Sequence, residues 1–321
     1  MKIGYLFSGQ GAQTIGMGKD IYEKYESAKK IYNKVEEITG KNIKKISFEG
    51  PEEELNKTEN TQLAILAESL AIAKILEENN IKAESTAGLS LGEYTALIED
   101  EIFDLETGIK IVQKRGEIMQ NLTPEGNWKM AAILGMEEEK VEEICKNIKS
   151  GFVVPANYNT IGQIVISGEE LAVIEAGEIA KEKGAKKVSI LNTAGPFHTK
   201  KLEKCSKELK KELEKVTINK KESKVIKNID GEKYTKTDNI KEILAKHLIS
   251  PVKFTKVLQT MYNTGIDTFV EIGPGKTLSG FVKRMKFEKE IKILNINNCE
   301  SLEKTIEELK KRWIIIAIQN K

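Results

Sequence analysis

Histidine and cysteine are scarce in this chain, and their scarcity restricts the chemistry open to it. The 321 residues include only two histidines, His198 and His247, and three cysteines. Cys145, Cys205 and Cys299 stand singly with no CxxC pair, so a metal site built from clustered His and Cys ligands is not expected. Because an odd number of isolated cysteines fits a reducing compartment better than a disulfide framework, we expect a cytoplasmic location.

The chain also lacks an excess of one charge and a long apolar run. Its 51 Lys and Arg residues nearly balance its 49 Asp and Glu residues, and the formal net charge is +2. Nucleic-acid-binding domains usually carry a strong basic excess, so no nucleic-acid partner is expected. No stretch approaches the roughly 18 apolar residues of a membrane span. Residues 1–7 are interpreted as a first strand rather than a signal peptide, and no membrane partner is expected.

Short β-branched runs alternate with longer helical patterns, which predicts an α/β fold. Strands are expected at Ile3–Phe7 and Ser85–Gly88, with helices over residues 61–76 and 91–98. Strand, helix and strand in this order predict a largely parallel sheet.

The pattern changes after a break at residues 124–126. Strands and helices are then expected in the order β-α-β-β-α-β, over residues 129–134, 137–148, 153–158, 163–167, 169–183 and 187–191. This order is the ferredoxin-like one. We therefore expect a small ferredoxin-like domain at 125–192. It would be inserted into an α/β-hydrolase-like large domain made of residues 1–124 and 193–321.

Residues 88–92, Gly-Leu-Ser-Leu-Gly, match the G-x-S-x-G pattern of a nucleophilic serine on a sharp strand-to-helix turn. The context is the required one, because a short strand precedes the motif and a helix follows it. The turn would place Ser90 at a helix N-terminus, where backbone N–H groups favour negative charge. A chance glycine-rich turn is the alternative interpretation.

A nucleophilic serine needs a base, and the chain offers two histidines. His198 follows a Gly-Pro turn and precedes a helical stretch, a loop position where functional residues often lie. His247 lies within a helical pattern, where a single histidine is more often structural. We therefore favour His198 as the base.

The glycine-rich loop after the first strand has several possible uses. The backbone N–H groups of Gln10 and Leu91 could form an oxyanion hole, although a plain glycine turn is equally compatible with the loop. A dinucleotide fingerprint starting at Gly9 fails at Thr14, and a phosphate-binding loop ending at residue 277 fails at Val270. Both nucleotide-binding interpretations are therefore excluded.

Taken together, these motifs resemble the malonyl-CoA:acyl carrier protein transacylases of bacterial fatty-acid synthesis. The resemblance extends from about residue 3 to about residue 284. It is carried by blocks in the family's order and spacing: FSGQGAQ (7–13), GLSLGEY (88–94), RGEIMQ (115–120), MAAI (130–133), NYN and GQ (157–163), GPFH (195–198) and EIGPG (271–275).

The resemblance implies roles for single residues. Ser90 would be the nucleophile and His198 its base, with Gln10 and Leu91 as oxyanion-hole donors. Arg115 would bind the free carboxylate of the malonyl group, a role that suits a planar two-pronged donor.

Two further residues are expected to contact the substrate. Asn157 belongs to one of the family's blocks. Phe197 resembles the bulky residue of malonyl-selective members, which leaves little room for a methyl branch.

His247 occupies a position where the family usually has Gln, whose backbone carbonyl is thought to orient the catalytic histidine. The chain also departs from the family at Leu89, where His is common, and at Ser8, where Pro is usual and Ser is expected to loosen the loop slightly.

The sequence thus predicts ping-pong transfer of a malonyl group from malonyl-CoA to an acyl carrier protein, with no metal or redox cofactor. A monomer is the expectation from the resemblance. A serine esterase or thioesterase is an alternative that would share Ser90 and His198 but have no use for Arg115. A non-catalytic acyl-binding module and an acyltransferase serving polyketide assembly in trans also remain open.

Overall fold

A parallel sheet forms the centre of the larger part of the molecule. In the computed structural model, which describes residues 1–191 and 195–319, sheet A has the strand order β2-β1-β7-β8. Its strands are β1 (Ile3–Phe7), β2 (Ser85–Gly88), β7 (Thr268–Ile272) and β8 (Lys292–Ile296). β1, β2 and β7 are buried along their whole length, as expected for parallel strands covered on both faces. Their carboxyl ends meet at one edge of the sheet, where the loops that follow them come together.

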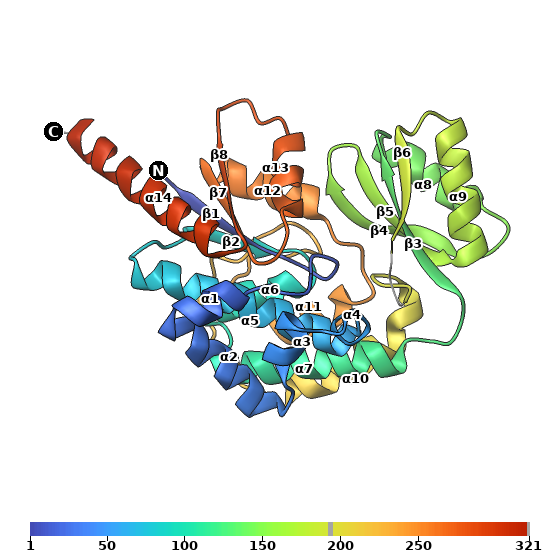
Figure 1. Cartoon of the computed structure of the whole chain (residues 1–321). Coiled ribbons are helices and arrows are strands. Elements are labelled where there is room, and N and C mark those ends of the chain that lie inside the picture. Colours follow the sequence, from blue (N-terminus) through green and yellow to red (C-terminus); the bar gives the residue numbers. More distant parts are fainter. Residues whose placement is uncertain (192–194, 320–321) are drawn as a thin grey trace.

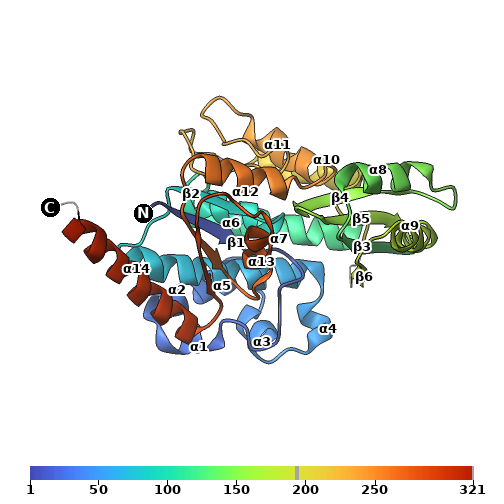
Figure 2. The same cartoon turned by 90° about the horizontal axis from the view of Figure 1, so that it is seen from above.

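Helices cover the faces of sheet A, and Figures 1 and 2 show α5 and α12 on opposite sides of it. α5 is buried along most of its length between the sheet and the outer helices α2 and α7, so its apolar residues surround the whole helix. The helices of this part are α1 (Lys19–Lys24), α2 (Glu26–Thr39), α3 (Ile43–Phe48), α4 (Glu52–Leu55), α5 (Thr58–Glu78), α6 (Leu91–Glu99), α7 (Leu105–Leu122), the 3-10 helix η1 (Lys200–Leu202), α10 (Glu203–Glu214), α11 (Ile240–His247), α12 (Phe254–Asn263), α13 (Thr277–Arg284) and α14 (Cys299–Gln319).

A separate antiparallel sheet, sheet B, lies beside the larger part (Figure 1). It has the strand order β4-β5-β3-β6 and carries its own helices. Its elements in chain order are β3 (Trp128–Leu134), α8 (Glu138–Asn147), β4 (Val153–Thr160), β5 (Gln163–Glu169), α9 (Glu170–Glu182) and β6 (Lys187–Leu191). The predicted α/β class and the β-α-β-β-α-β order are therefore confirmed. The division into domains at residue 125 stays a prediction, and the second predicted boundary, at 192–193, lies outside the described residues.

The two faces of sheet B have different surroundings. On β3, Ala131 and Ile133 point into a core shared with α8 and α9, whereas Met130 and Ala132 line a cavity. This alternation follows from the period of two in a strand. One face of sheet B therefore stabilises its own core and the other forms a wall of the cavity. In the described part of the chain, no helix combines the length and the apolar character that crossing a membrane requires.

Candidate active site

The predicted nucleophile lies on a strained turn at the carboxyl edge of sheet A. Ser90 links β2 to α6 with φ 53° and ψ −96°, a conformation that few residues other than glycine adopt. The turn requires the flanking glycines, because a Cβ on Gly88 would lie 2.1 Å from the backbone of Gly92. A Cβ on Gly92 would in turn lie 2.2 Å from the carbonyl oxygen of Phe7. The motif thus lets β2, α6 and β1 approach closely enough to expose the Ser90 hydroxyl.

The side chain of Asn228 holds this turn through two hydrogen bonds to its backbone. Its Oδ1 accepts a hydrogen bond from the backbone N–H of Ser90 at 2.8 Å, and its Nδ2 donates to the carbonyl of Gly88 at 2.8 Å. Asn228 is fully buried, so both bonds are shielded from water. Sequence reasoning missed this residue because no local pattern marks it.

His198 faces the serine hydroxyl. Its Nε2 lies 2.9 Å from Ser90 Oγ, and its Nδ1 lies 3.1 Å from the carbonyl oxygen of His247. Because a carbonyl can only accept, Nδ1 carries the proton, and the lone pair of Nε2 points at the hydroxyl. Burial, followed by the positive charge of Arg115, lowers the pKa of His198 to about 4. The imidazole is therefore neutral at pH 7, the form in which it can accept a proton.

Arg115 reaches the same hydroxyl from α7. Its Nη2 donates a hydrogen bond to Ser90 Oγ at 3.0 Å, and its guanidinium lies over the ring of Tyr94 at 5.1 Å. The residue is 1% exposed, yet no carboxylate in the described residues forms an ion pair with it, and its Nε has no hydrogen-bond partner there. A buried cation without an anion is costly. The site therefore favours an anionic group supplied from outside the chain.

The two predicted oxyanion donors come from two different segments of the chain. Gln10 is in the loop after β1, and Leu91 is the first residue of α6. Within the described ranges, neither backbone N–H donates to a loop, turn or cap acceptor. The loop after β1 is also held in place, because Ser8 Oγ donates to the carbonyl of Pro274 at 2.9 Å. The serine at this position thus ties two loops of the site together rather than loosening the first.

A cavity of about 530 Å³ opens above Ser90, between the edge of sheet A and the outer face of sheet B. Asn157 and Phe197 line it, together with the apolar side chain of Leu89. More than a third of the residues that line it come from the central part of the chain that forms sheet B and from the turn before η1. The cavity thus brings Ser90, His198 and the predicted substrate-contacting residues to one place.

The side chain of His247 lies beside the ring of His198 and does not line the cavity. Its ring is 5.0 Å from that of His198 and is fully buried, with neither nitrogen hydrogen-bonded in the described residues. Its Nδ1 lies 3.4 Å from Oε2 of Glu93. Burial, followed by the charges of His198 and Arg115, lowers the pKa of His247 well below its usual value. His247 therefore meets His198 through its carbonyl, while its imidazole remains neutral.

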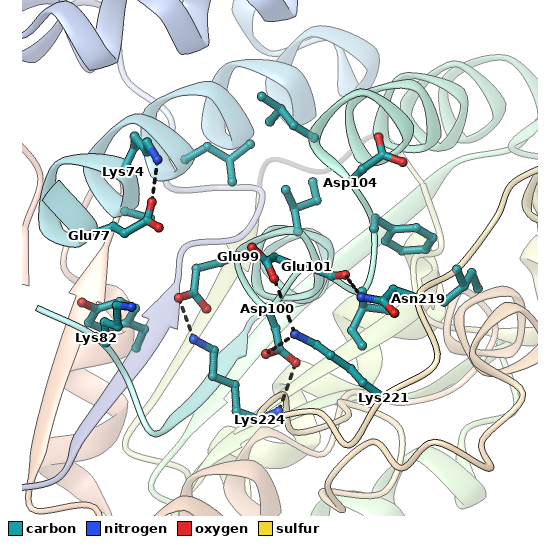
Figure 3. Close-up of a pocket in the computed structure, with 18 of the residues that line it drawn as sticks. Lys74, Glu77, Lys82, Glu99, Asp100, Glu101, Asp104, Asn219, Lys221 and Lys224 are labelled. Atoms are coloured by element: carbon teal, nitrogen blue, oxygen red, sulfur yellow. Dashed lines mark hydrogen bonds and ion pairs between the residues drawn. The ribbon is translucent and has the colours of Figure 1, made fainter. Parts of the chain in front are cut away.

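A larger groove, of about 1010 Å³, lies at the opposite end of α6. Its charged side chains largely pair with one another, including Lys74 with Glu77 at 2.7 Å and Lys224 with Glu99 at 2.8 Å (Figure 3). No serine or histidine is among the residues that line this groove. Ser90 and His198 line the smaller cavity instead.

A strained serine, a neutral imidazole, two open amides and a buried guanidinium thus lie together in a site that has the groups acyl transfer requires. The chain belongs to the acyl transferase domain family, whose sequence profile matches residues 4–313. It is 39% identical to the malonyl CoA-acyl carrier protein transacylase of Bacillus subtilis over 97% of this chain and 98% of that protein.

Solved structures agree with this assignment. The malonyl CoA-acyl carrier protein transacylase of Clostridium perfringens superposes with a TM-score of 0.93 at 42% identity, covering 99% of this chain and 100% of that one. A malonyl-transacylase in complex with its type II PKS acyl-carrier protein superposes with a TM-score of 0.90 at 32% identity, covering 96% and 100%.

Proposed function

We propose that this acyltransferase moves a malonyl group from malonyl-CoA to the phosphopantetheine thiol of an acyl carrier protein through a malonyl-Ser90 intermediate. The observation that carries the proposal is the buried guanidinium of Arg115, 3.0 Å from the nucleophilic hydroxyl and without a carboxylate partner among the described residues. A single methylene separates the carboxylate of malonate from its thioester carbon. A carboxylate bound to Arg115 would therefore place that carbon within reach of Ser90.

The first half of the proposed reaction forms the acyl-enzyme. Nε2 of His198 takes the proton of Ser90 as Oγ attacks the thioester carbon, and the carbonyl of His247 stabilises the imidazolium through Nδ1. The N–H groups of Gln10 and Leu91 receive the negative charge of the tetrahedral oxygen, and one such donor is typically worth about 3 kcal/mol. The C–S bond then breaks, and the proton on His198 passes to the leaving thiolate of coenzyme A.

The second half reverses these steps with a new thiol. His198 takes the proton of the phosphopantetheine thiol, which attacks the malonyl carbon, and Ser90 leaves with that proton. The route uses side chains and amides of this chain and draws on no cofactor. The solved relative in complex with its acyl-carrier protein supports a carrier protein as acceptor. The relatives' names support malonyl-CoA as donor. We place the enzyme in the cytoplasm, as a monomer.

Intact-mass measurement after brief mixing with malonyl-CoA tests the proposal. A malonyl adduct is expected on the wild type and not on Ser90→Ala. Transfer of that adduct to holo carrier protein, with little hydrolysis, would distinguish a transferase from a thioesterase. Steady release of coenzyme A without a carrier protein would contradict the proposal. Comparing carrier proteins of fatty-acid and polyketide systems as acceptors would identify the pathway.

A further inference from the structure

Glu93, in the first turn of α6, has an unusual set of partners for a buried carboxylate. The side chain is 1% exposed. Its Oε1 accepts a hydrogen bond from the hydroxyl of Tyr234 at 2.5 Å, and its Oε2 accepts one from the backbone N–H of Asn228 at 3.1 Å. Nδ1 of His247 lies 3.4 Å from the same Oε2. Residues 228–234 and the end of α11 therefore meet α6 at one carboxylate.

Two of these partners, Asn228 and His247, fix the reacting residues in place. The side chain of Asn228 fixes the turn of Ser90 through the Ser90 N–H and the Gly88 carbonyl. The carbonyl of His247 fixes His198 through Nδ1. The carboxylate of Glu93 is thus linked to Ser90 through Asn228 and to His198 through His247, and the backbone N–H of Glu93 also donates to the carbonyl of Ser90 at 3.2 Å.

We propose that Glu93 is a positioning residue, whose ionised carboxylate aligns Ser90 through Asn228 and His198 through His247. The carboxylate accepts hydrogen bonds from Tyr234 and Asn228 at once, and its Oε2 also lies 3.4 Å from Nδ1 of His247. When it is protonated, one oxygen becomes a donor and at least one of these contacts is lost. The alignment of serine and histidine therefore depends on the charge of Glu93.

The groups around Glu93 bring the pKa of its carboxyl group close to neutral pH. Burial raises its pKa to about 7, against the lowering effect of the hydrogen bonds from Tyr234 and Asn228. Asp230 raises this pKa further, and Arg115 on α7 lowers it. His247 on α11 is neutral and adds no charge. Because the ionised form is the aligning one, the reactivity of Ser90 is expected to fall as the pH drops through about 7.

The inference rests on the proposed role of Ser90 as nucleophile, and its test does not need the acyl donor. The rate of Ser90 sulfonylation by phenylmethanesulfonyl fluoride would be followed by intact mass from pH 5 to 9. In the wild type we expect an acidic limb near pH 7. In Glu93→Gln the rate at pH 8 should fall about tenfold to a hundredfold, the effect of losing one charge-assisted hydrogen bond. The limb near pH 7 should also disappear, leaving the rate nearly flat down to pH 5, because the pKa of His198 is lower, at about 4.

Glu99→Gln is the matched control, because Glu99 is a largely buried acid on the same helix, paired with Lys224 at 2.8 Å. This variant should keep the limb near pH 7. A Glu93→Gln protein that keeps the limb, or that reacts as fast as the wild type, would overturn the inference. So would a wild type whose Ser90 is not sulfonylated.

Tyr234→Phe provides a second test that retains the carboxylate, in case Glu93→Gln does not fold. Removing the hydroxyl takes away a hydrogen bond that lowers the pKa of Glu93, so the acidic limb should move to higher pH. An unshifted limb would count against the inference. Malonyl adduct formation on the same samples reports on the proposed function separately. If the wild type is sulfonylated but forms no malonyl adduct, the proposed function is wrong. The pH profile of sulfonylation would then still test the role of Glu93.

Discussion

Nη2 of Arg115 and Nε2 of His198 both face the hydroxyl of Ser90, at 3.0 Å and 2.9 Å. The cation that would select the substrate and the base that would activate the nucleophile therefore meet at one oxygen atom. Their proximity also lowers the pKa of His198, because a positive charge disfavours the imidazolium. A bound carboxylate on Arg115 would reduce that repulsion, so substrate binding and proton transfer are electrostatically linked.

Replacing Arg115 by Ala should abolish the preference for malonyl-CoA over acetyl-CoA. A charge-assisted pair is worth about 1.5–3 kcal/mol, which corresponds to about tenfold to a hundredfold in the ratio of kcat/KM values. Arg115→Lys should recover part of it, because an ammonium keeps the charge but not the two-pronged geometry. Steady-state kinetics with both donors measure the ratio. Arg312→Ala, a change of the same type outside the cavity, is the control. Equal preference in Arg115→Ala and wild type would contradict the role.

Asn228→Ala should slow acylation without abolishing substrate binding. The change removes both side-chain bonds that hold the elbow, so we expect kcat to fall at least tenfold and stability to fall by about 1–3 kcal/mol. Asn228→Asp should not restore activity, because its second oxygen would face the carbonyl of Gly88. Thermal unfolding and burst kinetics separate the two effects. Asn219→Ala, which removes a bond to the carbonyl of Glu101 at 3.2 Å, should leave kcat unchanged.

Gly92→Ala should destabilise the protein and disorder the serine turn. Its Cβ would lie 2.2 Å from a backbone oxygen of β1, which is held in place by pairing with β2 and β7. Gly280→Ala is a control of the same chemistry within a helix. There the nearest atom is the tip of Arg284 at 3.9 Å, and alanine is favoured over glycine by about 1 kcal/mol. The melting temperature should therefore fall in Gly92→Ala and rise in Gly280→Ala, each relative to the wild type. A Gly92→Ala protein as stable as the wild type would contradict the packing argument.

Glu68→Gln should stabilise the protein at alkaline pH. Glu68 on α5 is fully buried, neither carboxylate oxygen has a hydrogen-bond partner among the described residues, and burial raises its pKa to about 8. Relative to an ordinary value of 4.5, the stability that the proton contributes is present at low pH and lost as the pH rises to about 8. Thermal unfolding from pH 5 to 9 should show a smaller decline in Glu68→Gln than in the wild type. Glu78→Gln, at an exposed position of the same helix, should follow the wild-type curve.

Local patterns in the sequence determined the helices and strands and the turn that carries Ser90. The spacing of apolar residues marks strands and helices because side chains repeat with periods of 2 and 3.6, and Gly88 and Gly92 mark a turn that other residues cannot form. The order of strands and helices in residues 128–191 likewise predicts sheet B, because short connections restrict which strands can pair. Glu93 and Tyr94 stand in the same motif as Ser90, yet nothing local reveals what their side chains contact.

The tertiary structure alone decided which residues meet. Ser90 contacts Arg115, His198 and Asn228, which lie 25, 108 and 138 positions away along the chain. Such contacts depend on how sheet A and its loops bring distant segments together, and no periodicity in the sequence encodes them. The structure also gave His247 two separate contacts, its carbonyl to His198 and its ring beside Glu93. The physical reason is the same in each case: local propensity fixes the backbone of a segment, whereas burial and hydrogen bonding between segments fix its neighbours.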